Sequence, residues 1–172
     1  MYKEGIKMSK LHRILIVFTV MALVAMALPQ AQDWELTLSG FGASDNDFDN
    51  NSLGAAAQVG YYVTDDLEVY VRQSLNWIDP EGSDSAFDGT TRVGVDYHFT
   101  VGDNWRPFVG ANLGYTYGDT TDDSWIASVE GGVKYYVNTS TFVFGLVEYQ
   151  FLLEESFSDG IFAYALGIGF NF

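Results

Sequence analysis

The sequence contains no cysteine. Disulfides, cysteine-based zinc sites, thiolate-held iron–sulfur clusters and thiol nucleophiles are therefore excluded. A chain of 172 residues without disulfides must be held together by the packing of its own core or by a membrane.

Basic residues are also scarce. Lys and Arg number 8 against 23 Asp and Glu, and four of the basic residues fall within the first 13 positions. From Gln32 onward, four basic residues face 22 acidic ones, a formal charge of −18. Nucleic acid is excluded as a partner, because phosphate binding needs clustered Lys and Arg. No motif for a cofactor is present, and we expect none.

Long apolar runs are absent except for one near the start, from Ile14 to Leu28. Basic residues precede this run, and small residues follow it, which predicts a cleaved secretory signal peptide over residues 1–31. Cleavage fits after Ala27 or Ala31, and Met8 is an alternative start to Met1. The run is shorter than the roughly 20 residues of a membrane anchor. We therefore expect export through the Sec pathway and one folded domain over residues 33–172.

The rest of the chain has segments of alternating polarity separated by turn-rich stretches, which predicts strands. The expected strands are 34–44, 53–63, 67–77, 90–100, 106–117, 124–137, 141–153 and 160–172. Their lengths suit tilted strands that cross a membrane with about 9–11 residues. The connections alternate between short and long, as in outer-membrane barrels with short periplasmic turns.

The two faces of the expected strands differ in an informative way. In the fourth, Val93, Val95 and Tyr97 share one face, whereas Arg92 and Asp96 share the other. An apolar face can meet lipid, and a face of glycines with charges of both signs suits a narrow lumen. We therefore predict an all-β fold, an eight-stranded antiparallel up-and-down transmembrane β-barrel after an N-terminal signal helix. The alternative is a soluble lipocalin-like ligand-binding barrel, which needs an apolar cavity.

The polar faces carry charged residues at mid-strand, where a closed barrel of eight strands leaves little room. We predict that they form a hydrogen-bonded polar network in the lumen. Its members are Arg72, Arg92, Asp96, Glu130, Lys134 and Glu148. The alternative is a gated pore, in which the pairs exchange partners to admit water and small ions.

The four long connections contain 13 carboxylates and no Lys or Arg. Carboxylate oxygens are ligands for calcium, and Asp45, Asp47 and Asp49 resemble the start of a calcium-binding loop. The pattern lacks the glycine at its sixth place and the glutamate at its twelfth, where Ala56 stands. These three residues are a weak cation-site candidate, and a solvated acidic surface is the alternative.

His98 shares a strand face with Asp96 and is a candidate general base. No serine follows in a nucleophile motif. We therefore expect His98 to be structural and the protein not to be an enzyme.

Four stretches together resemble a known family. They are Gly60–Val69 (GYYVTDDLEV), Trp105–Tyr115 (WRPFVGANLGY), Lys134–Asn138 (KYYVN) and Tyr164–Phe172 (YALGIGFNF). The chain resembles the small bacterial outer-membrane β-barrel proteins of the OmpA/OmpX-like, porin-family type.

The resemblance implies a monomer in the outer membrane of a Gram-negative cell, in contact with lipid and lipopolysaccharide. It also implies that the assembly machinery reads Phe172. The family's members range from structural anchors to adhesins, so the resemblance does not fix a function. We expect a structural or surface-interactive role: envelope integrity, adhesion, or contact of the acidic loops with divalent cations or lipopolysaccharide. A narrow channel for small solutes or ions is the alternative.

Overall fold

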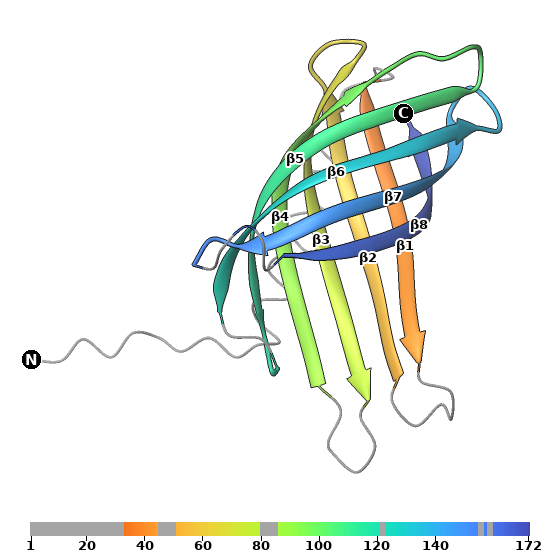
Figure 1. The fold of residues 1–172 in the computed structure, drawn as a ribbon. Coiled ribbons are helices and arrows are strands. Elements are labelled where there is room, and N and C mark those ends of the chain that lie inside the picture. Colours follow the sequence, from red (N-terminus) through yellow and green to blue (C-terminus); the bar gives the residue numbers. More distant parts are fainter. Residues whose placement is uncertain (1–32, 45–50, 80–85, 121–122, 155–156, 158–159) are drawn as a thin grey trace, which may run out of the picture. The chain divides into compact units, whose positions relative to one another are not determined.

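The computed structural model describes residues 33–44, 51–79, 86–120, 123–154, 157 and 160–172. These residues form eight strands: β1 (Trp34–Ser44), β2 (Asn51–Tyr62), β3 (Leu67–Asp79), β4 (Ala86–His98), β5 (Trp105–Gly118), β6 (Ser124–Tyr136), β7 (Thr141–Leu152) and β8 (Ile161–Asn171). Each strand pairs antiparallel with its sequence neighbours, and β8 pairs with β1 (Figure 1). The predicted closed barrel of eight strands is confirmed.

The chain divides into two units, Met1–Gln30 and Ala31–Phe172. The expected signal peptide over residues 1–31 lies outside the described residues. In the described part, no helix has the length and apolar character needed to cross a membrane.

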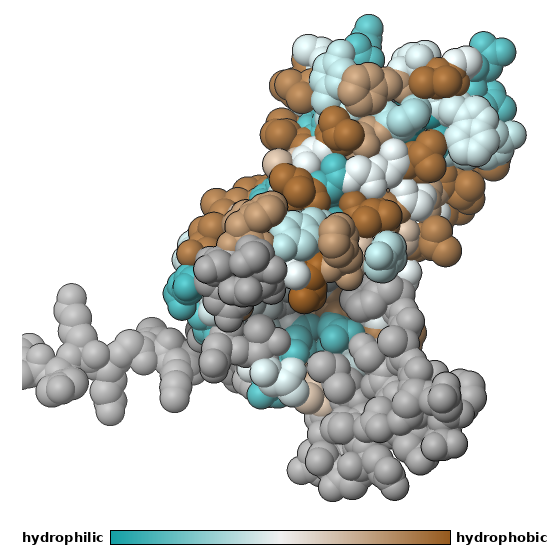
Figure 2. Space-filling view, viewed as in Figure 1, coloured by the Kyte–Doolittle hydropathy of each residue, from teal (hydrophilic) through white to brown (hydrophobic). Residues whose placement is uncertain are grey.

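The apolar face of the strands points outward, as the sequence predicts. In β4, Val93, Val95 and Tyr97 are about half exposed, whereas Arg92 and Asp96 are buried. Apolar side chains cover much of the outer surface of the barrel, and hydrophilic ones gather at the end that carries the short turns (Figure 2). An exposed apolar belt of this extent is what a lipid-facing barrel requires.

Three short turns lie at one end of the barrel, which we call the short-turn end. They connect β2 to β3, β4 to β5 and β6 to β7. Asn138 organises the last of them, since its Oδ1 accepts hydrogen bonds from the backbone N–H groups of Ser140 and Thr141 at 2.9 and 2.8 Å. The other end carries the remaining connections, which have five to eight residues against four to six at the short-turn end, and we call it the long-connection end.

Four strands, β2 to β5, extend farther toward the long-connection end than the sequence predicts. The fourth begins at Ala86 rather than near 90, and β3 continues to Asp79. Asp88-Gly89 has the composition of a turn. Here it stays in the ladder, because Gly89 pairs with Leu75 and Tyr117 on its two sides.

The seam between the first and last strands is shorter than the other ladders. It runs from Glu35↔Asn171 to Gly40↔Leu166. Trp34 and Phe172 extend it at the short-turn end by exchanging two backbone hydrogen bonds of 3.1 and 2.9 Å. Beyond Gly40, β1 continues against β2, and β8 continues against β7 as far as Ile161. Figure 1 shows β5–β8 curving away while β1–β4 run almost straight.

Candidate functional site: the charged lumen

The lumen of the barrel buries an unusual number of ionisable groups. Among the described residues, five carboxylates and three basic side chains are buried, together with His98. They are Glu35, Glu68, Asp96, Glu130 and Glu148 with Arg72, Arg92 and Lys134. Buried charges are tolerated only when they are paired or bind ions, so their partners determine what the lumen can do.

Four of these residues form what we call the mid-lumen group: Arg72, Arg92, Glu130 and Glu148. Arg72 donates from Nη1 to Oε2 of Glu130 at 2.8 Å and from Nη2 to Oε1 at 3.0 Å. Arg72 Nη1 also lies 3.5 Å from Oε2 of Glu148, and Arg92 Nε lies 3.6 Å from Oε1 of Glu148. The group is electrically balanced, with two cations and two carboxylates.

Neutral side chains complete the mid-lumen group. Tyr70 donates its hydroxyl to Glu130 Oε1 at 2.7 Å, and Gln58 Oε1 accepts from Arg72 Nε at 2.8 Å. Asn112 donates from Nδ2 to Glu148 Oε1 at 2.9 Å and to Glu130 Oε2 at 3.2 Å. These bonds join β2, β3, β5, β6 and β7, and therefore brace the barrel across its interior.

Lys134 belongs to a second group, nearer the short turns, which we call the lysine group: Glu35, Glu68 and Lys134. Lys134 Nζ donates to the two carboxylate oxygens of Glu35 at 2.6 and 2.8 Å and to Glu68 Oε2 at 3.2 Å. The ammonium also lies 5.0 Å from the ring centroid of Phe142 and 5.5 Å from that of Phe108. Cation–π contact supplements its two carboxylate partners.

All six residues of the predicted lumen network are buried, but they do not form one network. Lys134 joins the lysine group, while Asp96 forms no ion pair among the described residues and contacts the mid-lumen group through a side-chain hydrogen bond with Glu130. Glu35 and Glu68 were absent from the prediction, although they supply both partners of Lys134. The candidate cation residues Asp45, Asp47 and Asp49 lie outside the described residues.

Glycines make room for the buried carboxylates. A Cβ at Gly60 would collide with the carboxylate of Glu68, and a Cβ at Gly110 would collide with that of Asp96. Gly110 pairs directly with Asp96 across the β4–β5 ladder. Gly60 lies on β2, the strand next to the β3 strand that holds Glu68. The glycine-rich lumen face is thus shaped to hold acidic side chains close to the wall.

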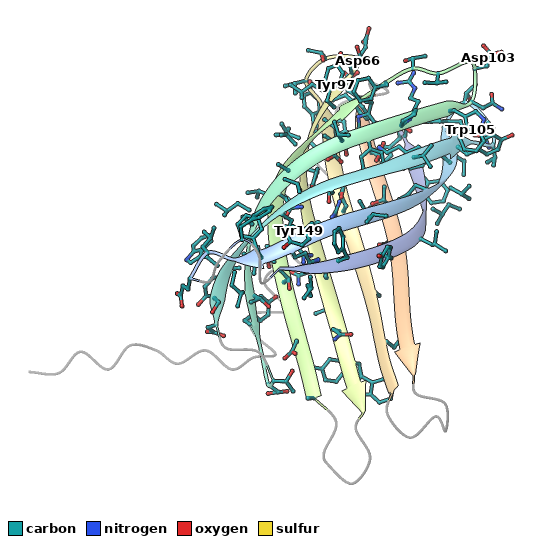
Figure 3. The ribbon with its side chains drawn as sticks, in the orientation of Figure 1. Asp66, Tyr97, Asp103, Trp105 and Tyr149 are labelled. Carbon is teal, nitrogen blue, oxygen red and sulfur yellow. The ribbon has the colours of Figure 1, made fainter. Side chains whose placement is uncertain are left out.

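Two cavities are open on either side of the charged residues. The one toward the long-connection end has a volume of about 690 Å³ and is lined by residues including Ser39, Thr90, Arg92 and Glu148. The other, about 960 Å³ at the short-turn end, is lined by Asp33, Asp65, Asp66, Asp103 and Arg106 among others. Figure 3 labels Asp66 and Asp103 at this end.

An apolar cluster with three aromatic rings lies in the lumen beside Lys134. Phe108, Phe142, Phe144 and Leu146 are buried and pack together. Gly167 and Gly169 of β8 lie under the rings of Phe144 and Phe142. The lumen is therefore filled by side chains between the two cavities, which is typical of an eight-stranded barrel.

Comparison with known proteins shows which family has this architecture. Residues 14–172 match the model of the OprF membrane domain family. Outer membrane porin F of Pseudomonas fluorescens is 28% identical over an alignment of 136 residues, and the alignment covers 71% of this chain and 41% of that protein. The chain thus spans about two fifths of the length of this relative.

Solved structures share the fold. The N-terminal β-barrel domain of Pseudomonas aeruginosa OprF aligns with a TM-score of 0.56 and 24% identity, covering 80% of this chain and 97% of that one. Neisserial surface protein A aligns with a TM-score of 0.63 and 15% identity, covering 83% and 98%. The chain belongs to the OprF membrane domain family and is an integral β-barrel of the Gram-negative outer membrane.

Proposed function

We propose that this barrel has a structural and surface-interaction role in the outer membrane, with a lumen closed to solutes. The observation that carries the proposal is the mid-lumen group, which joins strands on opposite sides of the barrel through charge-assisted hydrogen bonds. Such bonds are roughly twice as strong as neutral ones. Opening a pore would require several of them to break together.

The surface-interaction part rests on charge. The long connections are rich in carboxylates and contain no Lys or Arg, and loops on a rigid scaffold commonly carry binding. Divalent cations would let this acidic end approach the phosphates of neighbouring lipopolysaccharide. Envelope integrity and adhesion are the roles that such an end would serve, and the barrel would act as a monomer.

Recognition by the outer-membrane assembly machinery is a separate part of the proposal, and it concerns Phe172. The backbone of Phe172 is held by Trp34, whereas its side chain is 46% exposed at the rim of the barrel. A side chain in this position is available to a partner before the seam closes.

A narrow channel is the second candidate, and one observation favours it. Cavities of about 690 and 960 Å³ lie on the two sides of the charged residues, so only a thin layer of side chains would have to move. The relative from Pseudomonas fluorescens also has the name of a porin.

We also propose that the protein is not an enzyme. The candidate base His98 is 1% exposed, and its ring lies between Tyr62 and Phe108, at centroid distances of 5.3 and 5.4 Å. A substrate could not reach it in this position.

Planar-bilayer recording decides between a closed and a conducting lumen. The closed barrel predicts no conductance steps for the native protein. The double variant Arg92→Ala with Glu148→Ala removes two long side chains of the mid-lumen group and should produce steps, which shows that the recording would detect a pore. Steps of the same size in the native protein would overturn the closed lumen and favour the channel.

Binding to lipopolysaccharide vesicles with and without calcium tests the surface role separately.

A further inference from the structure

Charge is distributed unevenly between the two groups of the lumen. The mid-lumen group is balanced, but Glu35, Glu68 and Asp96 have only Lys134 to neutralise them among the buried described residues. With every carboxylate ionised, the surplus is two negative charges. An uncompensated buried carboxylate is strongly unfavourable, so this end of the lumen needs either a further cation or protons on its carboxylates.

The surplus lies at one place, beside His98. Glu68 and Asp96 are direct cross-strand partners on β3 and β4, and His98 follows Asp96 by two residues on the same face. One ligand atom from each of Glu68, Asp96 and His98 lies within 4.8 Å of the others. His98 Nε2 is 3.6 Å from Glu68 Oε2.

Three polar atoms of this cluster lack partners, whereas the two oxygens of Glu68 accept from Gln58 and Lys134 at 3.2 Å each. Asp96 Oδ1 and both ring nitrogens of His98 have no hydrogen-bond partner among the described residues. The Asp96 and His98 side chains are each 1% exposed, and Glu68 is fully buried. Unpartnered buried polar atoms are rare in native proteins and call for an explanation such as an ion.

We propose that Glu68, Asp96 and His98 bind a divalent transition-metal ion of the Zn²⁺ class. One imidazole nitrogen and two carboxylate oxygens form a donor set that such ions accept. Two donors on one ion stand roughly 3 to 4 Å apart when each bond is about 2.1 Å long, so small side-chain rotations complete the site. A divalent ion also neutralises the surplus of two charges.

Lys134 already contacts Glu68, so it would compete with a metal ion for this carboxylate. Its bonds allow it to give up Glu68. Lys134 Nζ contacts Glu68 through one bond of 3.2 Å, but it contacts Glu35 through two shorter ones. When a metal ion binds Glu68, Lys134 retains its two hydrogen bonds to Glu35. The lysine group and the metal site can therefore be satisfied together.

The short-turn end supplies an entry path. Its cavity is lined by Asp33, Asp65, Asp66 and Asp103, which attract cations. Tyr62 lines the same cavity and stacks against His98. The ring of Tyr62 thus lies between the site and this acidic cavity. Entry from this cavity requires Tyr62 to rotate and its hydroxyl to give up the hydrogen bond of 2.8 Å to Glu35.

Cobalt titration tests the site directly. The untagged protein, isolated from outer membranes in detergent and stripped with EDTA, receives Co²⁺ while its visible spectrum is recorded. We expect one Co²⁺ per barrel, displaced by Zn²⁺, and binding at least about tenfold weaker in His98→Gln and in Asp96→Asn. Glu154→Gln, at an exposed carboxylate outside the cavity that leads to the site, is the control and should bind as the native protein does.

Folding is followed in the same samples by the faster gel mobility of the unboiled barrel. If His98→Gln does not fold, Asp96→Asn and protection of the native protein against heat by Zn²⁺ still decide the question. A folded native protein without saturable binding at millimolar Co²⁺ would overturn the site. The same conclusion would follow if both variants bound Co²⁺ with the affinity of the native protein. In that case the surplus charge is met by protons.

Discussion

Arg72 on β3 and Glu130 on β6 form a two-point ion pair across the lumen, with N···O distances of 2.8 and 3.0 Å. The two strands are not neighbours in the sheet, so the pair ties together parts of the wall that no backbone ladder connects. The lumen is therefore a structural element of this barrel and not merely the space that its strands enclose.

Glu130→Ala should lower the free energy of unfolding by about 3–5 kcal/mol, because it leaves the buried guanidinium of Arg72 without its main partner. Urea titration followed by the mobility of the unboiled band measures the change. Glu154→Ala, at an exposed carboxylate, is the control and should have little effect. The double variant Arg72→Met with Glu130→Met should recover much of the loss. Equal loss in the double variant would mean that packing volume, and not charge pairing, sets the stability.

Lys134→Met should also destabilise the barrel by about 3–5 kcal/mol, since both Glu35 and Glu68 lose their cation. Adding Glu35→Gln removes one of the stranded carboxylates and should restore part of the stability. The same urea titration measures it. If the lysine group contributed only through cation–π contact with Phe142 and Phe108, the second substitution would bring no recovery.

Gly110→Ala should cost about 1–3 kcal/mol through overpacking, because the added methyl group collides with Asp96 and approaches the backbone oxygen of Val95. Gly131→Ala is the matched control, since the nearest atom to a Cβ there is 3.7 Å away. Thermal unfolding in the same detergent compares the two. Similar losses in both would show that the cost comes from the strand backbone and not from the space taken by Asp96.

Tyr117→Phe should destabilise the barrel by about 1 kcal/mol. Gln73 lies on the lipid-facing side of β3 and is nonetheless buried, with bonds from its Nε2 to the Tyr117 hydroxyl at 3.1 Å and to the Ser74 carbonyl at 2.8 Å. Thr91 donates to its Oε1 at 2.6 Å. Loss of the Tyr117 hydroxyl leaves an amide proton facing lipid.

Tyr115→Phe is the control for this prediction, because Tyr115 packs against Trp125 by its ring and its hydroxyl makes no hydrogen bond among the described residues. Unfolding of both variants in lipid vesicles should separate them. No difference between them would mean that the Gln73 amide is satisfied without Tyr117.

The barrel itself could be predicted from the sequence, because its cause is local. Alternation along Val93, Gly94, Val95, Asp96 and Tyr97 has the period of a strand and distinguishes two faces at once. Strand ends were less predictable. Asp88-Gly89 has turn composition, and only the neighbouring strands keep it in the ladder.

The pairing inside the lumen could not be predicted, because it is set by the closure of the sheet. Lys134 and Glu35 are 99 residues apart and lie on strands that do not adjoin. Asp96 and His98 could be placed on one face from their spacing alone. Their neighbour Glu68 enters only through the register of β3 against β4. A register predicted for that hairpin would have been the signal that identifies the cluster.

Because the seam between β1 and β8 is short, part of the barrel wall between these two strands has no backbone ladder. The ladder stops at Gly40↔Leu166, and Ile161–Ala165 line the same cavity as Arg92 and Glu148. Outward-facing Phe162 and Tyr164 thus share a space with lumen charges. The part of the wall without this ladder therefore brings lipid-facing side chains and the charged lumen to one cavity.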